Sequence, residues 1–374
     1  MRPAALLLAL LLGALVPAAG AVAQSIPDRR IFALGPDGMA AIPLPAGADL
    51  AYRVLDQAGR VVRDWAPAGP GGEIRLPAGG WYRLERRDGS GAMTVPGPRF
   101  AAGLVILVTG QSQADGFFFA TAPERGAFPA GPEDPPAPPV SALLLDCRGR
   151  EDCGPEGTVW VPVGEVLGAR LLLAELARRL GPVPLALGAA SWGGASIRDL
   201  ADVAAPAGQR LRRVAAAAAP ASAAILLAHG TTDTFRGTPP DAYQADLAIV
   251  VRALRAAGRP GMPLLQALLS PLDGPVRLLG SRRLATRLLS PDGGGWPMRW
   301  GLAWRSAADP EALRRAAAIR EAQAVAARAL GLRPGGRMGG VALGLDGVHW
   351  SRDGVREAAR QAAAALAEAL RPPR

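Results

Sequence analysis

The residues best suited to chemistry are a histidine near the end of the chain and a serine far upstream. The chain has only two histidines, and one of them, His349, follows Asp346 by three positions. An imidazole oriented by a carboxylate is the usual general base that activates a serine. Ser112, which follows Gly110 after an apolar run, is the nucleophile that this hypothesis requires. The structural alternative is an Asp-Gly turn that simply begins a helix.

The elements that must bring these residues together alternate between strands and helices. Continuous apolar runs predict buried strands at 104–108, 183–187, 223–227, 263–269 and 340–343. Helical patterns fall at 165–180, 209–218, 241–257, 310–330 and 353–370. This alternation predicts a five-stranded parallel sheet with helices on both faces.

Polar, glycine-containing segments follow four of these strands. They are residues 110–112, 191–196, 229–233 and 346–349. In an open parallel sheet, ligands bind outside the carboxyl ends of the strands. The sequence therefore predicts one site at this edge.

Each residue at this edge has a functional and a structural interpretation, and the sequence leaves both open. Ser112 is a nucleophile or a helix N-cap. Gly193 and Gly194 offer backbone N–H groups to an oxyanion or form an ordinary turn. His229 is an oxyanion donor, a second base or a buried structural histidine, and Thr232 is a donor or a loop anchor.

The rest of the chain is divided by composition. Residues 1–23 read as a signal peptide, with Arg2 before an apolar stretch and a small-x-small cleavage site at 21–23. We expect an exported protein, periplasmic or secreted, without a membrane span after cleavage; an uncleaved anchor is the alternative. Short runs and turn signals predict a small all-β, sandwich-like domain over 24–98. Residues 120–162, rich in Pro and Gly, predict an insertion above the sheet.

Charge and cysteine usage narrow the classes of partner and cofactor. The net charge is +10, and every basic residue is Arg because the chain has no Lys. These arginines are scattered without a basic tract, which argues against nucleic-acid binding. Cys147 and Cys153 predict a local disulfide in an exported chain. No histidine lies near them, so a metal site at this pair is not expected. No cofactor is expected elsewhere in the chain.

The segments at the sheet edge resemble those of the sialate O-acetylesterase-like carbohydrate esterases, a branch of the SGNH hydrolases. Residues 110–113 (Gly-Gln-Ser-Gln) resemble the family's Gly-Gln-Ser-Asn, and 191–197 resemble its Trp-Gly-Gly-Thr-x-Ile. Residues 228–233 resemble Gln-Gly-Glu-x-Asp, and 319–323 resemble an Arg-x-x-Gln helix. Residues 346–349 match Asp-x-x-His. The order is preserved over about 103–371.

The resemblance implies a flavodoxin-like three-layer α/β/α domain over 99–374 and a metal-free Ser-His-Asp esterase. Ser112, His349 and Asp346 correspond to the triad. The oxyanion hole would be formed by the backbone N–H of Ser112 together with that of Gly193 or Gly194.

The chain departs from the family at two points of this edge. Gln113 replaces the Asn after the nucleophile, and in the third segment His229 replaces a Gln and Thr231 replaces a Glu. The chain also has no Asn at all, so the family's Asn donor must be absent or replaced by His229 or Thr232. The loss of one oxyanion donor costs about 100- to 1000-fold in rate.

The expected function is removal of an O-acetyl or other short acyl group from a carbohydrate through an acyl-enzyme. Gln111, Gln113 and Trp192 are expected to contact the substrate. Two alternatives remain: an acyltransferase with the same triad, and a glycan-binding protein on a decayed esterase fold. The oligomeric state is not predicted.

Overall fold

The computed structural model describes only part of the chain. The described residues are 26, 28–44, 50–69, 72–94, 97–115, 128–146, 157–269, 310–343 and 349–371. The signal segment 1–23, both members of the Cys147–Cys153 pair and the triad residue Asp346 lie outside them, so these stay predictions.

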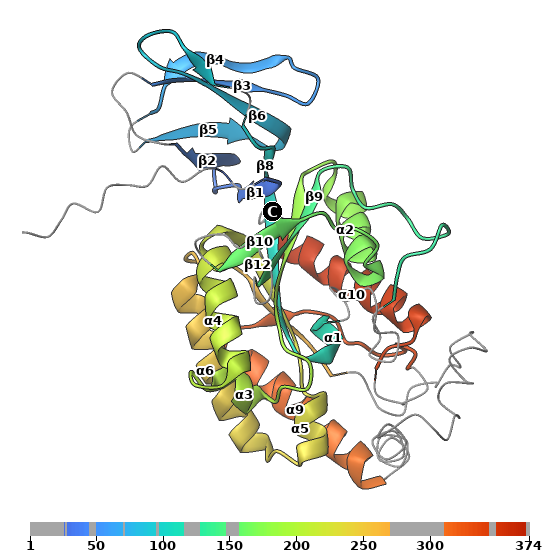
Figure 1. Ribbon diagram of the computed structural model, residues 1–374. Helices are drawn as coiled ribbons and strands as arrows, with labels where there is room; N and C mark the ends of the chain where they lie inside the picture. Colours follow the sequence, from blue (N-terminus) through green and yellow to red (C-terminus); the bar gives the residue numbers. More distant parts are fainter. Residues whose placement is uncertain are drawn as a thin grey trace, which may run out of the picture.

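A central sheet organises the protein (Figure 1). Its strands are β8 (Phe100–Gly110), β9 (Ser141–Asp146), β10 (Thr158–Val161), β11 (Leu185–Ser191), β12 (Ser222–Ala228), β13 (Leu264–Ala267) and β14 (Arg333–Pro334). They lie in the order β10-β9-β11-β8-β12-β13-β14, and every neighbouring pair is parallel except β10 with β9. The path β11-β8-β12-β13-β14 is the 2-1-3-4-5 order of flavodoxin-like folds.

Four of the five predicted strands coincide with β8, β11, β12 and β13. The fifth prediction is wrong, because 340–343 forms only a single bridge, from Leu343 to Trp350. Its apolar side chains are buried against a helix instead of continuing the sheet. The prediction of an insertion over 120–162 is also wrong in part, since β9 is a parallel strand inside the sheet. Six of the seven strands in this order are therefore parallel to one another, and β9 is one of them.

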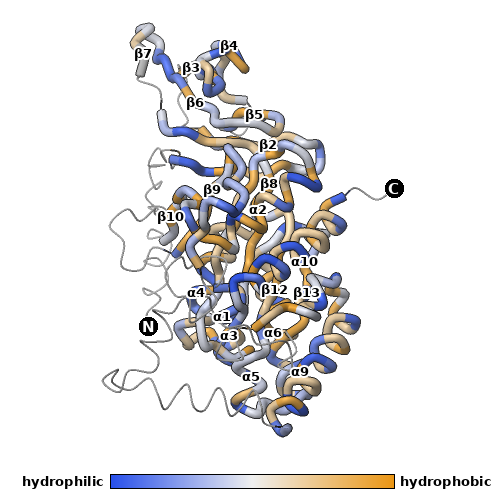
Figure 2. Tube along the Cα trace, turned by 90° about the vertical axis from the view of Figure 1, so that its right-hand side faces the viewer, coloured by the Kyte–Doolittle hydropathy of each residue, from blue (hydrophilic) through white to orange (hydrophobic). Residues whose placement is uncertain are grey.

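Helices cover both faces of this sheet. The helices α2 (Leu167–Leu180) and α10 (Arg352–Leu370) pack on one face. The helices α3 (Ile197–Ala201), α4 (Pro206–Ala218), α6 (Pro240–Ala257) and α9 (Pro310–Ala329) pack on the other. Alternate residues of β12 enter the two cores, Leu226 on the α10 side and Leu227 on the α6 side. In Figure 2 the strands β12 and β13 are mostly hydrophobic in colour, whereas hydrophobic and hydrophilic segments alternate along the helices beside them.

In the described part of the chain, seven short strands come before β8, and they lie in the upper part of Figure 1. They are β1 (Arg30–Ala33), β2 (Met39–Pro43), β3 (Ala51–Leu55), β4 (Val61–Pro67), β5 (Glu73–Pro77), β6 (Gly79–Arg87) and β7 (Met93–Thr94). The amino half of β8 pairs with β1 and β6, and its carboxyl half pairs with β11 and β12. Phe100 and Ala102 belong to the core of the preceding strands. One strand thus joins both parts, and the domain boundary at residue 98 stays a prediction.

Two kinds of feature are absent from the described residues. None of the helices in these ranges is long and apolar enough to cross a membrane. The same ranges hold no group of three or more His, Cys, Asp or Glu that could bind a metal ion.

Candidate active site

The end of β8 is held tightly between its two neighbours. Gly110 has a φ of +140°, and a Cβ there would lie 1.9 Å from the carbonyl oxygen of Ala228. The Gln111 N–H donates to that oxygen at 3.2 Å, and the Trp192 N–H donates to the Gly110 oxygen at 3.0 Å. Only glycine fits this position. Ser112 follows as the first residue of the short helix α1 (Ser112–Asp115) and is buried.

The two glutamines on either side of Ser112 connect this loop to the loop after β12. Gln111 Oε1 accepts from the Thr232 N–H at 3.1 Å, and Gln111 Nε2 donates to Gln113 Oε1 at 2.9 Å. Gln113 Nε2 donates to the Thr231 hydroxyl at 2.6 Å. Both glutamines are buried. The two side-chain amides therefore hold the residues on either side of Ser112 in place against the loop after β12.

The loop after β11 lies beside α1. A Cβ on Gly193 would lie 2.8 Å from Asp115 Oδ2, so glycine allows the carboxylate of α1 to approach. Gly194 has a φ of +77°, and both glycines are exposed. Ser196 then caps α3 in a capping box with Asp199. This loop presents exposed backbone next to the helix that begins with Ser112.

A buried carboxylate ties the loop after β12 to α3. Asp233, in α5 (Thr231–Arg236), accepts the Ile197 N–H at 3.1 and 3.2 Å and the Thr238 hydroxyl at 3.1 Å. Burial raises the pKa of Asp233 to about 6, against the effect of these hydrogen bonds and of Arg236. The loops after β11 and β12 are thus joined through one carboxyl group.

His229 belongs to a second buried network, whose proton positions follow from two backbone groups. The Leu269 N–H can only donate, so the atom of Gln323 that faces it at 2.8 Å is oxygen. Gln323 Nε2 then donates to the His229 carbonyl at 2.8 Å and to the Tyr243 hydroxyl at 2.9 Å. The Tyr243 proton is left for His229 Nδ1, 2.6 Å away. His229 is therefore the neutral tautomer protonated on Nε2.

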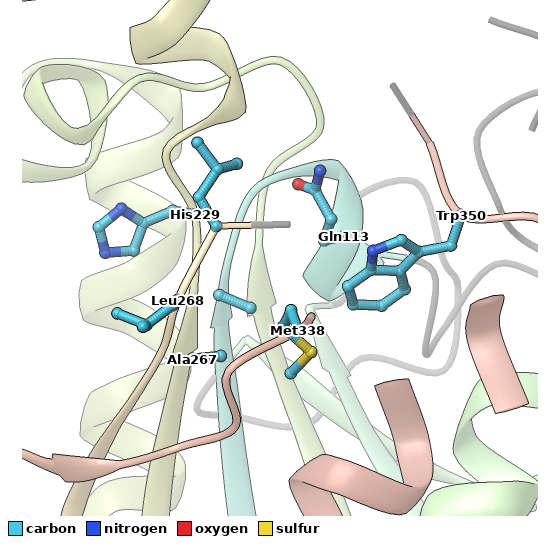
Figure 3. Close-up of a pocket in the computed structure, with 8 residues that line it drawn as sticks. Gln113, His229, Ala267, Leu268, Met338 and Trp350 are labelled. Atoms are coloured by element: carbon cyan, nitrogen blue, oxygen red, sulfur yellow. The ribbon is translucent and has the colours of Figure 1, made fainter. Parts of the chain in front are cut away.

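Burial lowers the pKa of His229 to about 4. A side-chain interaction with Gln266 acts in the opposite direction and raises this pKa. Neither His229 Nε2 nor Gln266 Oε1 has a hydrogen-bond partner among the described residues, so the effect of burial is the larger one. The ring points away from Gln113 (Figure 3). These contacts are those of a structural histidine that fixes its loop.

The C-terminal segment reaches α1 through Trp350. Trp350 and Gln113 line one cavity of about 10 Å³, together with Met338 and residues that follow β12 and β13 (Figure 3). This volume holds about one water molecule and no substrate. The adjacent Ser351 N–H donates to the Ala342 oxygen at 2.9 Å. His349, next to Trp350, thus belongs to a segment that lines the same small cavity as Gln113, the neighbour of Ser112.

A larger cavity opens beside the loop after β11. Its volume is about 170 Å³, and Trp192, Gly193, Gly194, Asp199 and Arg236 are among its lining residues. The Arg236 guanidinium donates to Asp199 Oδ2 at 2.8 Å and to the Ser196 hydroxyl at 3.1 Å.

The structure gathers Ser112, Gly193, Gly194, Thr232 and both glutamines at one sheet edge, as the strand ends predict. The sequence interpretation missed Tyr243, Asp199 and Arg236. Arg236 closes α5 and Asp199 stands three residues after Ser196, so a capping-box search would have found the carboxylate.

Comparisons with known proteins give structural similarities only. No family model and no curated protein matches the chain. It is similar to a carbohydrate acetylesterase from Xanthomonas citri, at 17% identity and a TM-score of 0.49, over 91% of this chain and 73% of that one. An acetyl-xylooligosaccharide esterase variant from Geobacillus matches at 13% identity and a TM-score of 0.39, over 71% and 94%. An esterase from Pseudoalteromonas matches at 11% and 0.33, over 68% and 93%. These low identities and TM-scores assign the chain to no family.

Proposed function

We propose that the protein is an exported serine esterase that removes O-acetyl or other short acyl groups from a carbohydrate. One observation carries the proposal: Ser112 begins a helix directly after a strand end that is held between its two neighbours, beside the exposed Gly193–Gly194 turn. A nucleophile next to free backbone donors is what acyl transfer requires.

In this mechanism the Ser112 hydroxyl oxygen attacks the ester carbonyl, and His349 takes its proton. Asp346 orients the imidazole. The backbone N–H groups of Ser112 and of Gly193 or Gly194 stabilise the negative oxygen. His349 then protonates the sugar oxygen as its bond to the acyl carbon breaks, and water attacks the acyl-enzyme by the reverse sequence.

The third donor is proposed on geometry. The Thr232 backbone N–H already donates to Gln111, so its hydroxyl is the group left to serve as donor. His229 enters the proposal as a positioning residue, because its Nδ1 accepts from Tyr243 and its ring faces away from Gln113.

The cavity beside Trp192 is the proposed place for the sugar. Trp192 is half-buried, with the Arg210 guanidinium over its ring, and gives the cavity apolar surface, while Asp199 and Arg236 offer polar contacts. A position next to Gly193 brings a bound sugar ester close to the proposed oxyanion donors. Gln111 and Gln113 shape the site from behind, through the loops they join.

The test is hydrolysis of an activated acetyl ester by the wild type and Ser112→Ala. We expect a fall in kcat of about 1000-fold or more, since the nucleophile is lost. Ser90→Ala, in an exposed turn, is the control and should keep full activity. Equal rates for the wild type and Ser112→Ala would sink the proposal.

The assignment of the base has its own test. His349→Gln should abolish turnover, and His229→Gln should retain measurable turnover with reduced stability. The reverse pattern would identify His229 as the base and contradict the proposed mechanism.

A further inference from the structure

A third cavity lies at the opposite edge of the sheet. It has a volume of about 370 Å³ and is formed where α6 ends, β13 begins and β14 begins. Arg255, Arg259 and Arg333 line it, together with Met262, Leu264 and neighbouring glycines and prolines. The proposed esterase site lies at the carboxyl ends of the strands, so the two sites are separated by the length of the sheet.

The three arginines are anchored by backbone oxygens. Arg255 donates to the Leu330 carbonyl at the end of α9. Arg333 donates to the Ala369 carbonyl in the last turn of α10 at 3.0 Å, and Arg259 donates to the Leu34 carbonyl beside β1 at 2.8 Å. Each guanidinium has five N–H groups, so these bonds leave donors for a ligand.

No described carboxylate lies within 4.0 Å of any of these three guanidinium groups. Arginines on the neighbouring helices differ, since Arg314 pairs with Glu311 and Arg360 pairs with Glu357. The helix ends contribute only partial negative charge, about half an elementary charge each. The cavity therefore keeps an excess of positive charge.

We propose that this cavity binds an anionic sugar unit through its carboxylate or phosphate group. Guanidinium groups match the geometry of both oxyanions, and the bonds are charge-assisted. The cavity is larger than one oxyanion needs and falls within the usual range for small ligands, about 300–1,000 Å³. The apolar side chains of Met262 and Leu264 give the remainder of the ring a surface to contact.

The site is separate from the proposed catalytic edge, so it holds a sugar that is not the one being deacylated. Because Arg259 contacts the end of β1, the bound unit would also lie beside the N-terminal strands.

The test is titration calorimetry on the full chain with two probes, a galacturonic acid trisaccharide and glucose 6-phosphate. We expect at least one to bind the wild type, with an affinity that falls as salt is raised. Arg255→Ala combined with Arg333→Ala should weaken binding about tenfold or more, since charge-assisted hydrogen bonds are lost. The matched control is Arg252→Ala, an exposed arginine of α6 outside the cavity lining, which should bind as the wild type does.

The two probes distinguish a carboxylate ligand from a phosphate ligand. Binding of neither, or equal affinity in the wild type and the double variant, would overturn the proposal. Equal binding of a neutral galactose trisaccharide would do the same. A urea unfolding curve checks that the double variant is folded. Ser112→Ala should bind both probes unchanged, so a failed esterase assignment and a failed anion site give different results.

Discussion

At the carboxyl edge of the sheet, the loops after β8, β12 and β13 are joined by buried, mostly uncharged side chains, whereas the amino edge is closed by partly or fully exposed arginines. Gln113, Gln323 and Tyr243 at the first edge have their hydrogen bonds inside the protein. Arg255 and Arg333 at the second edge reach helix ends from the solvent. A buried polar group that loses its hydrogen bond costs free energy, so buried hydrogen bonds fix the geometry of their loops. Exposed charged groups can bond to water instead, so their contacts contribute little. We therefore expect substitutions at the two edges to differ strongly in cost.

The largest effect is expected from Gln323→Ala. This change removes three buried hydrogen bonds, those that Gln323 makes to the Leu269 N–H, the His229 carbonyl and the Tyr243 hydroxyl. We expect a loss of about 4 kcal/mol in the free energy of unfolding. Urea denaturation measures it, with the exposed Gln209→Ala as a control that costs under about 0.5 kcal/mol. A similar cost for both variants would remove the contrast between buried and exposed amides.

Asp233→Asn should change how stability depends on pH. The pKa of Asp233 in the folded protein, about 6, lies above the ordinary 3.8, so the folded state holds the proton more tightly than the unfolded state does. The resulting stabilisation is fully present below about pH 4 and is lost as the pH rises through 6. Across this pH window the free energy of unfolding of the wild type should fall by up to about 3 kcal/mol relative to that of the Asp233→Asn variant. Urea curves at pH 4, 5, 6 and 7 give this difference. Parallel pH profiles for the two proteins would contradict a buried, titrating carboxyl group.

Tyr243→Phe should have an intermediate effect. It removes the donor to His229 Nδ1 and one acceptor of Gln323, both of them buried. We expect about 1.5 kcal/mol of destabilisation at pH 7. Combined with Gln323→Ala, it should cost less than the sum of the single changes, because the two residues share a network. Strict additivity would mean that the network is not coupled.

The smallest effect is expected at the amino edge. Arg333→Ala removes an exposed hydrogen bond to the end of α10. We expect less than about 0.5 kcal/mol in the free energy of unfolding. Thermal or urea unfolding measures it, and a loss as large as that of Tyr243→Phe would break the comparison between the edges.

Apolar periodicity is why the sequence predicts so much of the sheet. β8, β11, β12 and β13 are buried on both faces and read as continuous apolar runs. β14 has two exposed residues, Arg333 and Pro334, and leaves no such run. β9 is apolar, but it stands within a stretch rich in Pro and Gly that reads as a loop.

The site is predictable to the level of the edge and no further. Strand ends place Ser112, Gly193 and His229 near one another, because parallel strands share an orientation. The direction of the His229 ring depends on Tyr243 and Gln323, which come from two separate helices. No local pattern around His229 encodes those partners.

The shared strand β8 has a consequence for the order of folding during synthesis. Its amino half pairs with β1 and β6, which precede it in the chain, and its carboxyl half pairs with β11 and β12, which follow it. Because a chain emerges from its amino end, the first half can pair before the second half has partners. The completed half then holds one end of β8 in an extended conformation and offers its free end as a template for β11 and β12. Ser112 thus follows a strand that begins to form before the rest of its site has been made.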